Sequence, residues 1–329
     1  MIRAIRAVAI AVALVVVVAA CAGAWLVYGD RSLPAEASDV IVAKGSGIAA
    51  ISAQLGQAGI VRSATLFRLY LRAARPAISV EAAEYSFAPH ETMRDVASTL
   101  AAGGRPVVVW VTIPEGFTAR QIAQRLAERG LFPAADFLRV AYGTSIEIGG
   151  ARTKNLEGYL FPDTYAVPRD AAPEAVAAIM SAQFQKELPR DFRSAAKRQR
   201  MSVPQIITVA SLIEAEAKVD SERALMAGVY YNRLRKGMPL EVDATIEYAL
   251  PAHKAALSFG DLAIDSPYNT YKHVGLPPTP IANPGRASID AAFHPRQSDY
   301  FYYVYMGNGH HKFSRTLAEQ QRAEQEYLR

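Results

Sequence analysis

The stretch that organises this chain is Ser202–Lys218, SVPQIITVASLIEAEAK. Ser202 is a favourable helix N-cap, and Pro204 suits the first helical turn, where a missing N–H costs nothing. The residues that follow are apolar on nearly every side, which is typical of a helix buried in a protein core. The sequence therefore predicts a buried helix at the centre of a C-terminal domain.

Two carboxylates interrupt this helix, at Glu214 and Glu216. Residues two apart lie roughly 200° apart around a helix, so the two side chains cannot share one site. Glu214 falls between Ile207 and Ala210 on the helical wheel, where burial would disfavour the charged carboxylate and keep the group protonated near neutral pH. Lys218, at i+4 from Glu214, would oppose this effect. A protonated carboxyl can serve as a general acid, whereas the alternative is a glutamate that simply reaches water or a basic partner.

The amino terminus carries an uncharged stretch, Ala7–Tyr28, that is long enough to cross a bilayer as a helix. Arg3 and Arg6 precede it, which predicts a cytoplasmic amino terminus and export of the remaining chain. A cleaved signal peptide and a lipoprotein signal ending at Cys21 are the alternatives. Because the apolar run continues past Cys21 through Val27, the sequence favours an uncleaved anchor.

Composition bounds the remaining possibilities. The 329 residues are enough for about two domains, and 51% of them are hydrophobic. A single cysteine excludes an intrachain disulfide and a cysteine-based zinc site. The net charge of +5 is modest and no block of lysine and arginine occurs, so nucleic acid is not an expected partner. Gly-rich phosphate loops and the HExxH zinc pattern are also absent.

Two copies of one pattern, near residues 40–61 and 109–132, precede the central helix. The matched positions are Gly45 with Gly116, Ile51 with Ile122, Leu55 with Leu126, and Gly59 with Gly130. Each copy predicts a strand, a glycine turn, an amphipathic helix and a glycine C-cap. A further strand at 84–87 and a helix at 92–100 are expected between them. The form resembles LysM-type carbohydrate-binding units; the alternative is a spacer that positions a second domain.

The region 155–168 is rich in aromatic and turn residues, which suits either a sugar site or a rigid loop. Helices are predicted at 171–188, 191–200 and 222–236, the last with Asp220 or Ser221 as N-cap and Gly237 at its end. The proline-rich segment 265–283 predicts a long loop. A hairpin of 300–306 with 311–313 and a capped final helix starting near Thr316 complete the chain.

Six segments then carry a family resemblance: LEGYLFPDTY (156–165), ASLIEAEA (210–217), VYYNRLRKGMPLEVDATIEYAL (229–250), SPYNTY (266–271), GLPPTPIANPG (275–285) and GHHKFSRTLAE (309–319). In this order they resemble the YceG-like family, the MltG-type endolytic murein transglycosylases of bacterial cell walls. The similarity extends from the anchor to the last helix. It implies an α+β fold with a transmembrane helix, small LysM-like α/β units, and a mixed catalytic domain with a buried glutamate-bearing helix. The expected divisions are 1–29 for the anchor, 30–39 for a linker, 40–150 for the LysM-like units and 151–329 for the catalytic domain.

The resemblance also implies functional residues. The family's catalytic glutamate is the first in its A-S-I-x-E-x-E segment, which corresponds to Glu214, with Leu212 in place of the isoleucine. Family-pattern polar residues that imply substrate contacts are Asn232, Asp243, Thr245, Tyr248, Ser266, Asn269, Asn283 and His311. One departure is Gln320, where the family often has histidine.

The implied reaction cleaves the MurNAc–GlcNAc β-1,4 bond without water and leaves a 1,6-anhydroMurNAc end, which sets glycan strand length. Protonated Glu214 would donate to the glycosidic oxygen and then accept the proton of the muramyl C6 hydroxyl. One alternative is a lysozyme-like hydrolase with Asp243 as second carboxylate, and another is a non-catalytic glycan-binding scaffold that recruits synthases. No metal or cofactor is implied. The expected substrate is the peptidoglycan glycan strand, the expected location is the inner membrane with a periplasmic catalytic domain, and peptidoglycan synthases are candidate partners.

Overall fold

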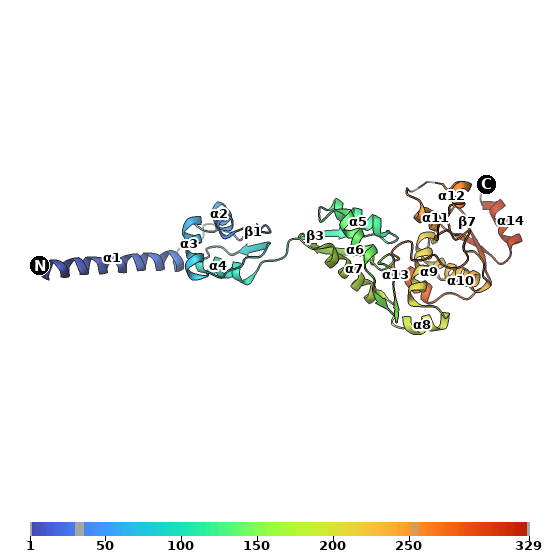
Figure 1. The fold of residues 1–329 in the computed structure, drawn as a ribbon, viewed down its shortest axis with the longest axis horizontal. Helices are drawn as coiled ribbons and strands as arrows, with labels where there is room; N and C mark the ends of the chain where they lie inside the picture. The colour runs from blue at the N-terminus through green and yellow to red at the C-terminus, as the bar shows by residue number, and fades with distance from the viewer. Residues whose placement is uncertain (1, 30–35, 253, 255, 328–329) are drawn as a thin grey trace. The chain divides into compact units, whose positions relative to one another are not determined.

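The computed structural model describes residues 2–29, 36–252, 254 and 256–327. The chain divides into two compact units, and Figure 1 labels many of their helices and some of their strands. The first comprises residues 1–108 and 168–170, and the second comprises 109–167 and 171–329. Helices and short two-stranded sheets occur in both, so the mixed α+β class is confirmed. The first six residues of the predicted linker, 30–35, lie outside the described residues.

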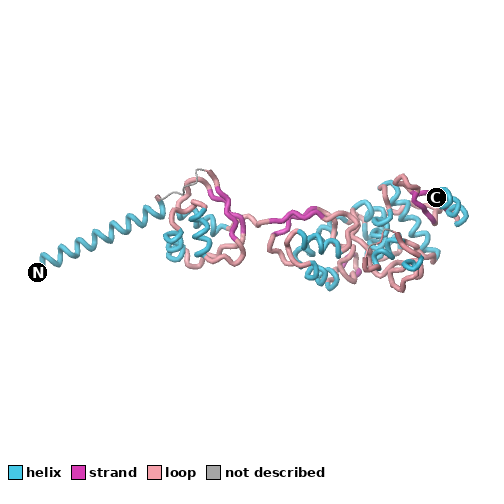
Figure 2. Tube along the Cα trace, turned by 90° about the horizontal axis from the view of Figure 1, so that it is seen from above, coloured by secondary structure: helices cyan, strands magenta, loops and turns pink. Residues whose placement is uncertain are grey.

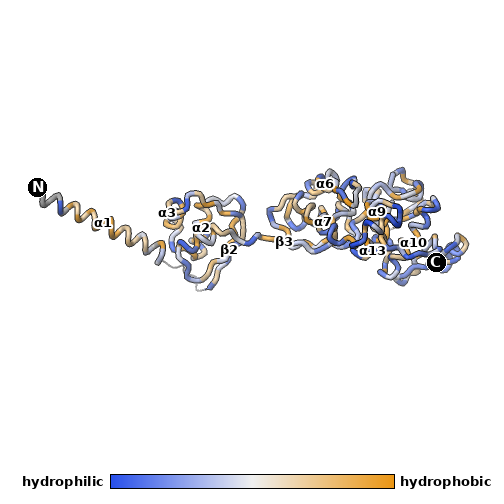
Figure 3. The backbone as a smooth tube through the Cα atoms, turned by 90° about the horizontal axis from the view of Figure 1, so that it is seen from below, coloured by the Kyte–Doolittle hydropathy of each residue, from blue (hydrophilic) through white to orange (hydrophobic). Residues whose placement is uncertain are grey.

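Helix α1 (Ile2–Tyr28) opens the first unit. Its segment Val8–Trp25 is long and apolar enough to cross a membrane, and none of it is buried by the protein. Figure 3 shows the hydrophobic colouring along most of this helix. A membrane anchor and a signal sequence both fit this observation.

The rest of the first unit is a small α/β body. Strand β1 (Ser38–Val42) pairs antiparallel with β2 (Ala83–Phe87), and alternation along β1 buries Val40 and Val42. Helices α2 (Ile48–Gln57), α3 (Ala64–Ala74) and α4 (Met93–Ala102) cover these strands with one shared apolar core. Thr92 and Asp95 form the capping box that starts α4.

The predicted repeat is confirmed as structure. In the second copy, β3 (Val108–Thr112) leads to α5 (Ala119–Glu128), as β1 leads to α2. The matched turn glycines, Gly45 and Gly116, have φ of 80° and 76°, and Gly59 and Gly130 after the helices both have φ of 72°. A side chain is disfavoured in this left-handed region, which explains why glycine recurs at these positions.

The two copies nevertheless belong to different units. Strand β3 pairs with β6 (Thr164–Pro168), and α5 and α6 (Ala134–Gly143) share a core with α7 (Pro173–Glu187). The unit boundary therefore falls between 108 and 109, whereas the sequence placed a domain boundary between 150 and 151. The physical reason is that Leu156 and Leu160 supply the apolar surface on which the second copy packs. A small hairpin of β4 (Glu147–Ile148) and β5 (Ala151–Arg152) lies between these elements along the chain.

The remaining elements of the second unit lie toward its carboxyl-terminal end (Figure 1), and Figure 2 shows that this part of the chain is mostly helix and loop. They are α8 (Phe192–Gln199), α9 (Val203–Glu216), α10 (Asp220–Lys236), α11 (Asp243–Ala249), α12 (Phe259–Leu262), α13 (Arg286–Phe293), β7 (Tyr302–Tyr305), β8 (His311–Ser314) and α14 (Leu317–Tyr327). Helices α8, α10, α11 and α13 all contact α9, the predicted central helix.

Helix α9 forms for the reasons that the sequence indicates. Ser202 accepts the backbone N–H of Gln205 in a capping box, and Pro204 lies in the first turn. The residues from Ile206 to Ile213 are all buried. The helix ends at Glu216, because Ala217 is extended with ψ of 125°. Lys218 thus lies outside the helix. The prediction that Lys218 lies one helical turn from Glu214 is wrong.

The structure confirms most of the other local predictions and contradicts one. Gly237 ends α10 with φ of 63°, as predicted. The N-cap of α10 is Val219, which makes no side-chain hydrogen bond, so the prediction of Asp220 or Ser221 as N-cap is wrong. Apart from an isolated bridge at Val274, the segment 265–283 holds no strand or helix, which confirms the long loop. The predicted hairpin is confirmed, with Tyr302 opposite Ser314.

Candidate active site

Glu214 lies in the last turns of α9 with only 8% of its side chain exposed. The backbone N–H of Gly285 donates to its Oε2 at 2.9 Å, and Nη1 of Arg223 lies 3.5 Å from the same oxygen. Among the described residues no hydrogen bond reaches Oε1. One oxygen is therefore held by a backbone donor and an ion pair, while the other has no hydrogen-bond partner among the described residues.

Arg223 is the cation beside Glu214, and it is itself buried. Its Nε donates to Asp220, one turn earlier on α10, at 2.9 Å, and its Nη1 donates to the hydroxyl of Ser288 on α13. These contacts fix the guanidinium against Glu214. The sequence had assigned the neighbouring cation to Lys218, which is exposed beyond the end of α9.

A second carboxyl, Glu115, lies next to Glu214. The turn after β3 reaches the loop before α13 through two backbone bonds, from Gly116 N–H to the Asn283 carbonyl at 3.0 Å and from Asn283 N–H to the Phe117 carbonyl at 2.9 Å. A β-carbon built on Gly285 would lie only 2.0 Å from Glu115 Oε1. With Gly285 bonded to Glu214, the two carboxyl groups are within about 8 Å of each other by covalent geometry.

The electrostatics of Glu115 reflect this proximity. Partial burial and the charge of Glu214 raise the pKa of Glu115, and Arg223 opposes the shift. Sequence reasoning missed Glu115, although a signal was available. The matched residue of the first copy is Lys44, so the position before the turn glycine changes from a cation to an anion between two otherwise similar copies.

A cleft of about 380 Å³ lies beside these groups. Its walls include Gly116, Thr118, Ala215, Tyr248 and Ala282. A β-carbon at Gly116 would lie 3.6 Å from Cγ of Glu214, which places the glutamate stem against the cleft wall. The cleft therefore gives a substrate access to the end of α9.

Behind the cleft lies Glu157, which is fully buried. It accepts the N–H of Ala119 at the start of α5 at 2.9 Å, the amide of Asn283 at 3.1 Å, and the hydroxyl of Tyr248 at 3.0 Å. Burial raises the pKa of Glu157 to about 7, against the opposing effect of the Ala119 and Tyr248 donors. Glu157 thus joins the second repeat copy to the cleft wall.

The surrounding segment 155–168 is a loop that leads into β6, rather than a sugar-stacking surface. Tyr159, Phe161 and Tyr165 are all buried, so their faces cannot receive a sugar ring. Asn283 fixes the loop by accepting the N–H groups of Gly158 and Leu160 at 2.9 and 2.8 Å.

The structure brings two of the predicted substrate-binding residues near Glu214. Tyr248 lines the cleft, and its ring packs 5.0 Å from that of Tyr268. Asn283 is fully buried, and both its side-chain oxygen and nitrogen are occupied by protein groups. Within the described structure Asn283 acts by positioning the loop that carries Gly285.

Four other predicted residues hold the loops around α11. Thr245 donates to the Val242 carbonyl, and Asn269 donates to the carbonyls of Leu262 and Ile264. Ser266 accepts the N–H of Tyr268, and Asp243 accepts the hydroxyl of Tyr271. Thr245 and Asn269 are fully buried. Substrate contacts by these residues remain a prediction.

Glu216 belongs to a separate cluster. Tyr303 donates to its Oε2 at 3.3 Å, and burial together with the charge of Asp243 raises the pKa of Glu216 to about 7. His311 lies in the same cluster, with its ring 5.7 Å from that of Tyr303 and Nδ1 2.8 Å from Oε2 of Glu222. The two glutamates of α9 thus have different partners, as the helical wheel predicts.

The last two sequence-derived positions hold neighbouring backbone. Asn232 donates to the carbonyls of Ser298 and Tyr300 at 2.8 Å. Gln320, the departure from the family pattern, is buried and donates to the Tyr303 carbonyl at 3.0 Å. Both positions therefore support the region around β7.

The chain is similar in sequence and fold to several known proteins. The model of the YceG-like family matches residues 40–326. An endolytic murein transglycosylase of Bacillus subtilis is 32% identical over 93% of this chain and 90% of its own length. One from Streptococcus pneumoniae is also 32% identical, and the match spans 60% of that longer protein. The crystal structure of a YceG-like protein of Listeria monocytogenes aligns with 88% of this chain and 99% of its own, at 33% identity and a TM-score of 0.59.

Proposed function

This chain belongs to the YceG-like family, and we propose that it is an endolytic murein transglycosylase that cleaves MurNAc–GlcNAc β-1,4 bonds of peptidoglycan. The observation that carries the proposal is Glu214, which has one oxygen held by Gly285 and Arg223 and no hydrogen bond to the other among the described residues. A carboxyl fixed in this way can both donate and accept a proton at one place.

In the first step, Glu214 donates its proton from Oε1 to the glycosidic oxygen, and the bond from that oxygen to C1 of MurNAc breaks. The carboxylate that forms is stabilised by the Gly285 N–H and the Arg223 guanidinium, which are already in place. Preorganised donors cost no reorganisation when the charge develops.

In the second step, the C6 hydroxyl of MurNAc attacks C1 and gives its proton to Glu214. The products are a 1,6-anhydro end and a free GlcNAc C4 hydroxyl, so atoms balance without water. Positive charge develops on the sugar between the two steps, and the carboxylate form of Glu115, which adjoins Gly285, is the group we assign to stabilise it.

The same proposal includes the location. Helix α1 is the anchor, the body that follows it is a LysM-like glycan-binding unit, and the cleft faces the cell wall outside the inner membrane. Cleavage within nascent strands would then set glycan length close to the membrane, where peptidoglycan synthases are candidate partners. The glycine-turned repeat and the length of α1 support these assignments.

The decisive experiment is a digest of purified peptidoglycan by the full chain and by Glu214→Gln, with products identified by mass spectrometry. Anhydro ends from the wild type and none from the variant are expected. Reducing ends would instead indicate a hydrolase, for which Glu115 is a better second carboxylate than Asp243 because Glu115 adjoins Glu214. If the Glu214→Gln variant keeps the function of the wild type, the protein is a glycan-binding scaffold that does not need this carboxyl.

A further inference from the structure

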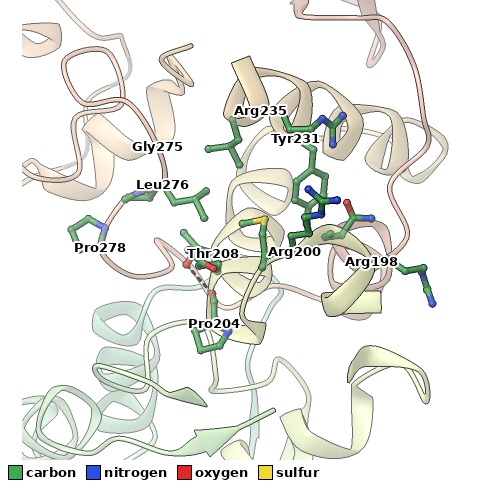
Figure 4. Close-up of a pocket in the computed structure, with 14 residues that line it drawn as sticks. Arg198, Arg200, Pro204, Thr208, Tyr231, Arg235, Gly275, Leu276 and Pro278 are labelled. Atoms are coloured by element: carbon green, nitrogen blue, oxygen red, sulfur yellow. Dashed lines mark hydrogen bonds between the residues drawn. The ribbon is translucent and has the colours of Figure 1, made fainter. Parts of the chain in front are cut away.

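A second and larger cavity, of about 840 Å³, lies at the opposite end of α9. Figure 4 shows Arg198, Arg200 and Arg235 on one side of it and the loop residues Gly275, Leu276 and Pro278 on the other. Among the described lining residues there are three arginines and no acidic side chain. The cavity is therefore a positively charged space, and the mechanism above does not use it.

The cavity and the cleft lie along one face of α9. Pro204 and Thr208 line the cavity, and Ala215 lines the cleft. These positions, together with Ser211, are spaced by four, three and four residues, which is one helix face. The hydroxyl of Ser211 accepts the N–H of Ile281 at 3.1 Å, so the loop 275–285 runs along this face from the cavity to Glu214.

The backbone of Arg200 is unusual for a residue with a long side chain. Arg200 ends α8 in the left-handed conformation, with φ of 57°, where glycine is the usual residue. Retaining a long charged side chain at such a position has a conformational cost. Arg198 pairs with Asp191 at 2.8 Å and Arg235 donates to Asn232, whereas no bond to the side chain of Arg200 is formed by the described residues.

The proposed substrate supplies a matching anion. Peptidoglycan strands carry stem peptides with free carboxylates, and arginine binds carboxylates in a bidentate manner. Pro204 and Ala215 are about 16 Å apart along the helix axis. An extended stem of about five residues spans roughly 17 Å. The stem is thus comparable in length with the distance between the two sites, and it would pass over the loop 275–285, which covers α9 between them.

We propose that the arginine-lined cavity is a subsite for the carboxylates of the stem peptide, with Arg200 and Arg235 as its ligands. This inference rests on the proposed function and adds the part of the substrate that is recognised. It makes the enzyme selective for strands that carry acidic stems. Chemically amidated stems and stripped strands should lose this recognition, because neither presents the carboxylates.

The test compares kcat/KM on peptide-bearing strands with kcat/KM on strands whose stems have been removed by an amidase. In Arg200→Gly and Arg235→Gln the ratio of the two values should fall at least about threefold, chiefly through KM, since bonds to charged groups are among the stronger hydrogen bonds. Arg200→Gly suits the left-handed backbone, so its thermal midpoint should not fall. Lys236→Gln removes the same charge from the exposed neighbour of Arg235 outside the cavity and serves as the matched control.

A ratio that falls less than about threefold in both arginine variants, or that falls equally in Lys236→Gln, would overturn the subsite. If the wild type cleaves neither substrate, the proposed function fails instead. The subsite is then tested directly by titrating the full chain with isolated stem peptide and with its amidated form. Binding of the acidic form that is weakened by Arg200→Gly supports the subsite, and equal binding of both forms contradicts it.

Discussion

A β-carbon on Gly285 would lie 2.0 Å from Oε1 of Glu115, so the N-cap residue of α13 leaves no space for a side chain beside this carboxyl. The N–H of the same residue holds Glu214 at 2.9 Å. Gly285 therefore separates the two carboxyls of the site, with its backbone bonded to one and its missing side chain accommodating the other.

Gly285→Ala should reduce kcat/KM at least about tenfold while the protein stays folded. The φ of Gly285 is −74°, which alanine adopts freely, so the added methyl acts mainly by displacing the flexible end of Glu115. In a Glu115→Ala background the same change should cost much less. Rates of anhydro-product formation and thermal midpoints check this, and an undiminished cost in that background would contradict it.

Glu214→Gln should abolish cleavage, and Glu216→Gln should act more weakly, because the two side chains have different partners. Glu214 adjoins Arg223 and Gly285, whereas Glu216 accepts from Tyr303. Circular dichroism should show both variants folded, with any loss in Glu216→Gln appearing as lowered stability. Equal loss of activity in two fully stable variants would show that the catalytic face of α9 is misassigned.

Stability should fall as pH rises from about 4.5 to about 7, in part through Glu157. Its pKa is raised to about 7 in the folded state, so between these values the folded protein keeps a proton that the unfolded chain has lost. The contribution is present below pH 4.5 and is lost through pH 7, amounting to roughly 3 kcal/mol.

Urea midpoints measured across this pH range in detergent, on the full chain and on Glu157→Gln, check the effect. The variant should have a flatter profile, because glutamine does not titrate. Glu216, with its pKa also raised to about 7, contributes in the same direction, so some slope should remain. If the urea midpoint of Glu157→Gln depends on pH as steeply as that of the wild type, Glu157 is excluded as a source of the pH dependence of stability.

The segment 7–28 should place everything after it outside the cytoplasm, since Arg3 and Arg6 precede it. The side chain of Arg3 lies outside the described residues, so this expectation rests on sequence. A reporter that works only outside the cytoplasm, fused after residue 329, should be active. Activity of a cytoplasmic reporter there would refute the topology, and a lipid-modified, cleaved Cys21 would favour the lipoprotein.

The sequence by itself determined the local structure. Ser202 and Pro204 start α9, and the paired glycines follow the helix of each repeat copy. The apolar content of α9 predicts its central position. Each of these features could be predicted because capping, left-handed φ and hydrophobic burial depend on residues close in the chain. The family segments likewise located Glu214 and the loop that reaches it.

Only the tertiary structure decided what surrounds Glu214. Glu115 and Gly285 come from distant segments, and they meet at Glu214 because backbone bonds to Asn283 join the second repeat copy to the loop before α13. The cation is Arg223 rather than Lys218, since α9 ends two residues before the lysine and α10 returns the arginine to the site. Electrostatic effects follow distance in space, which the order of residues does not specify.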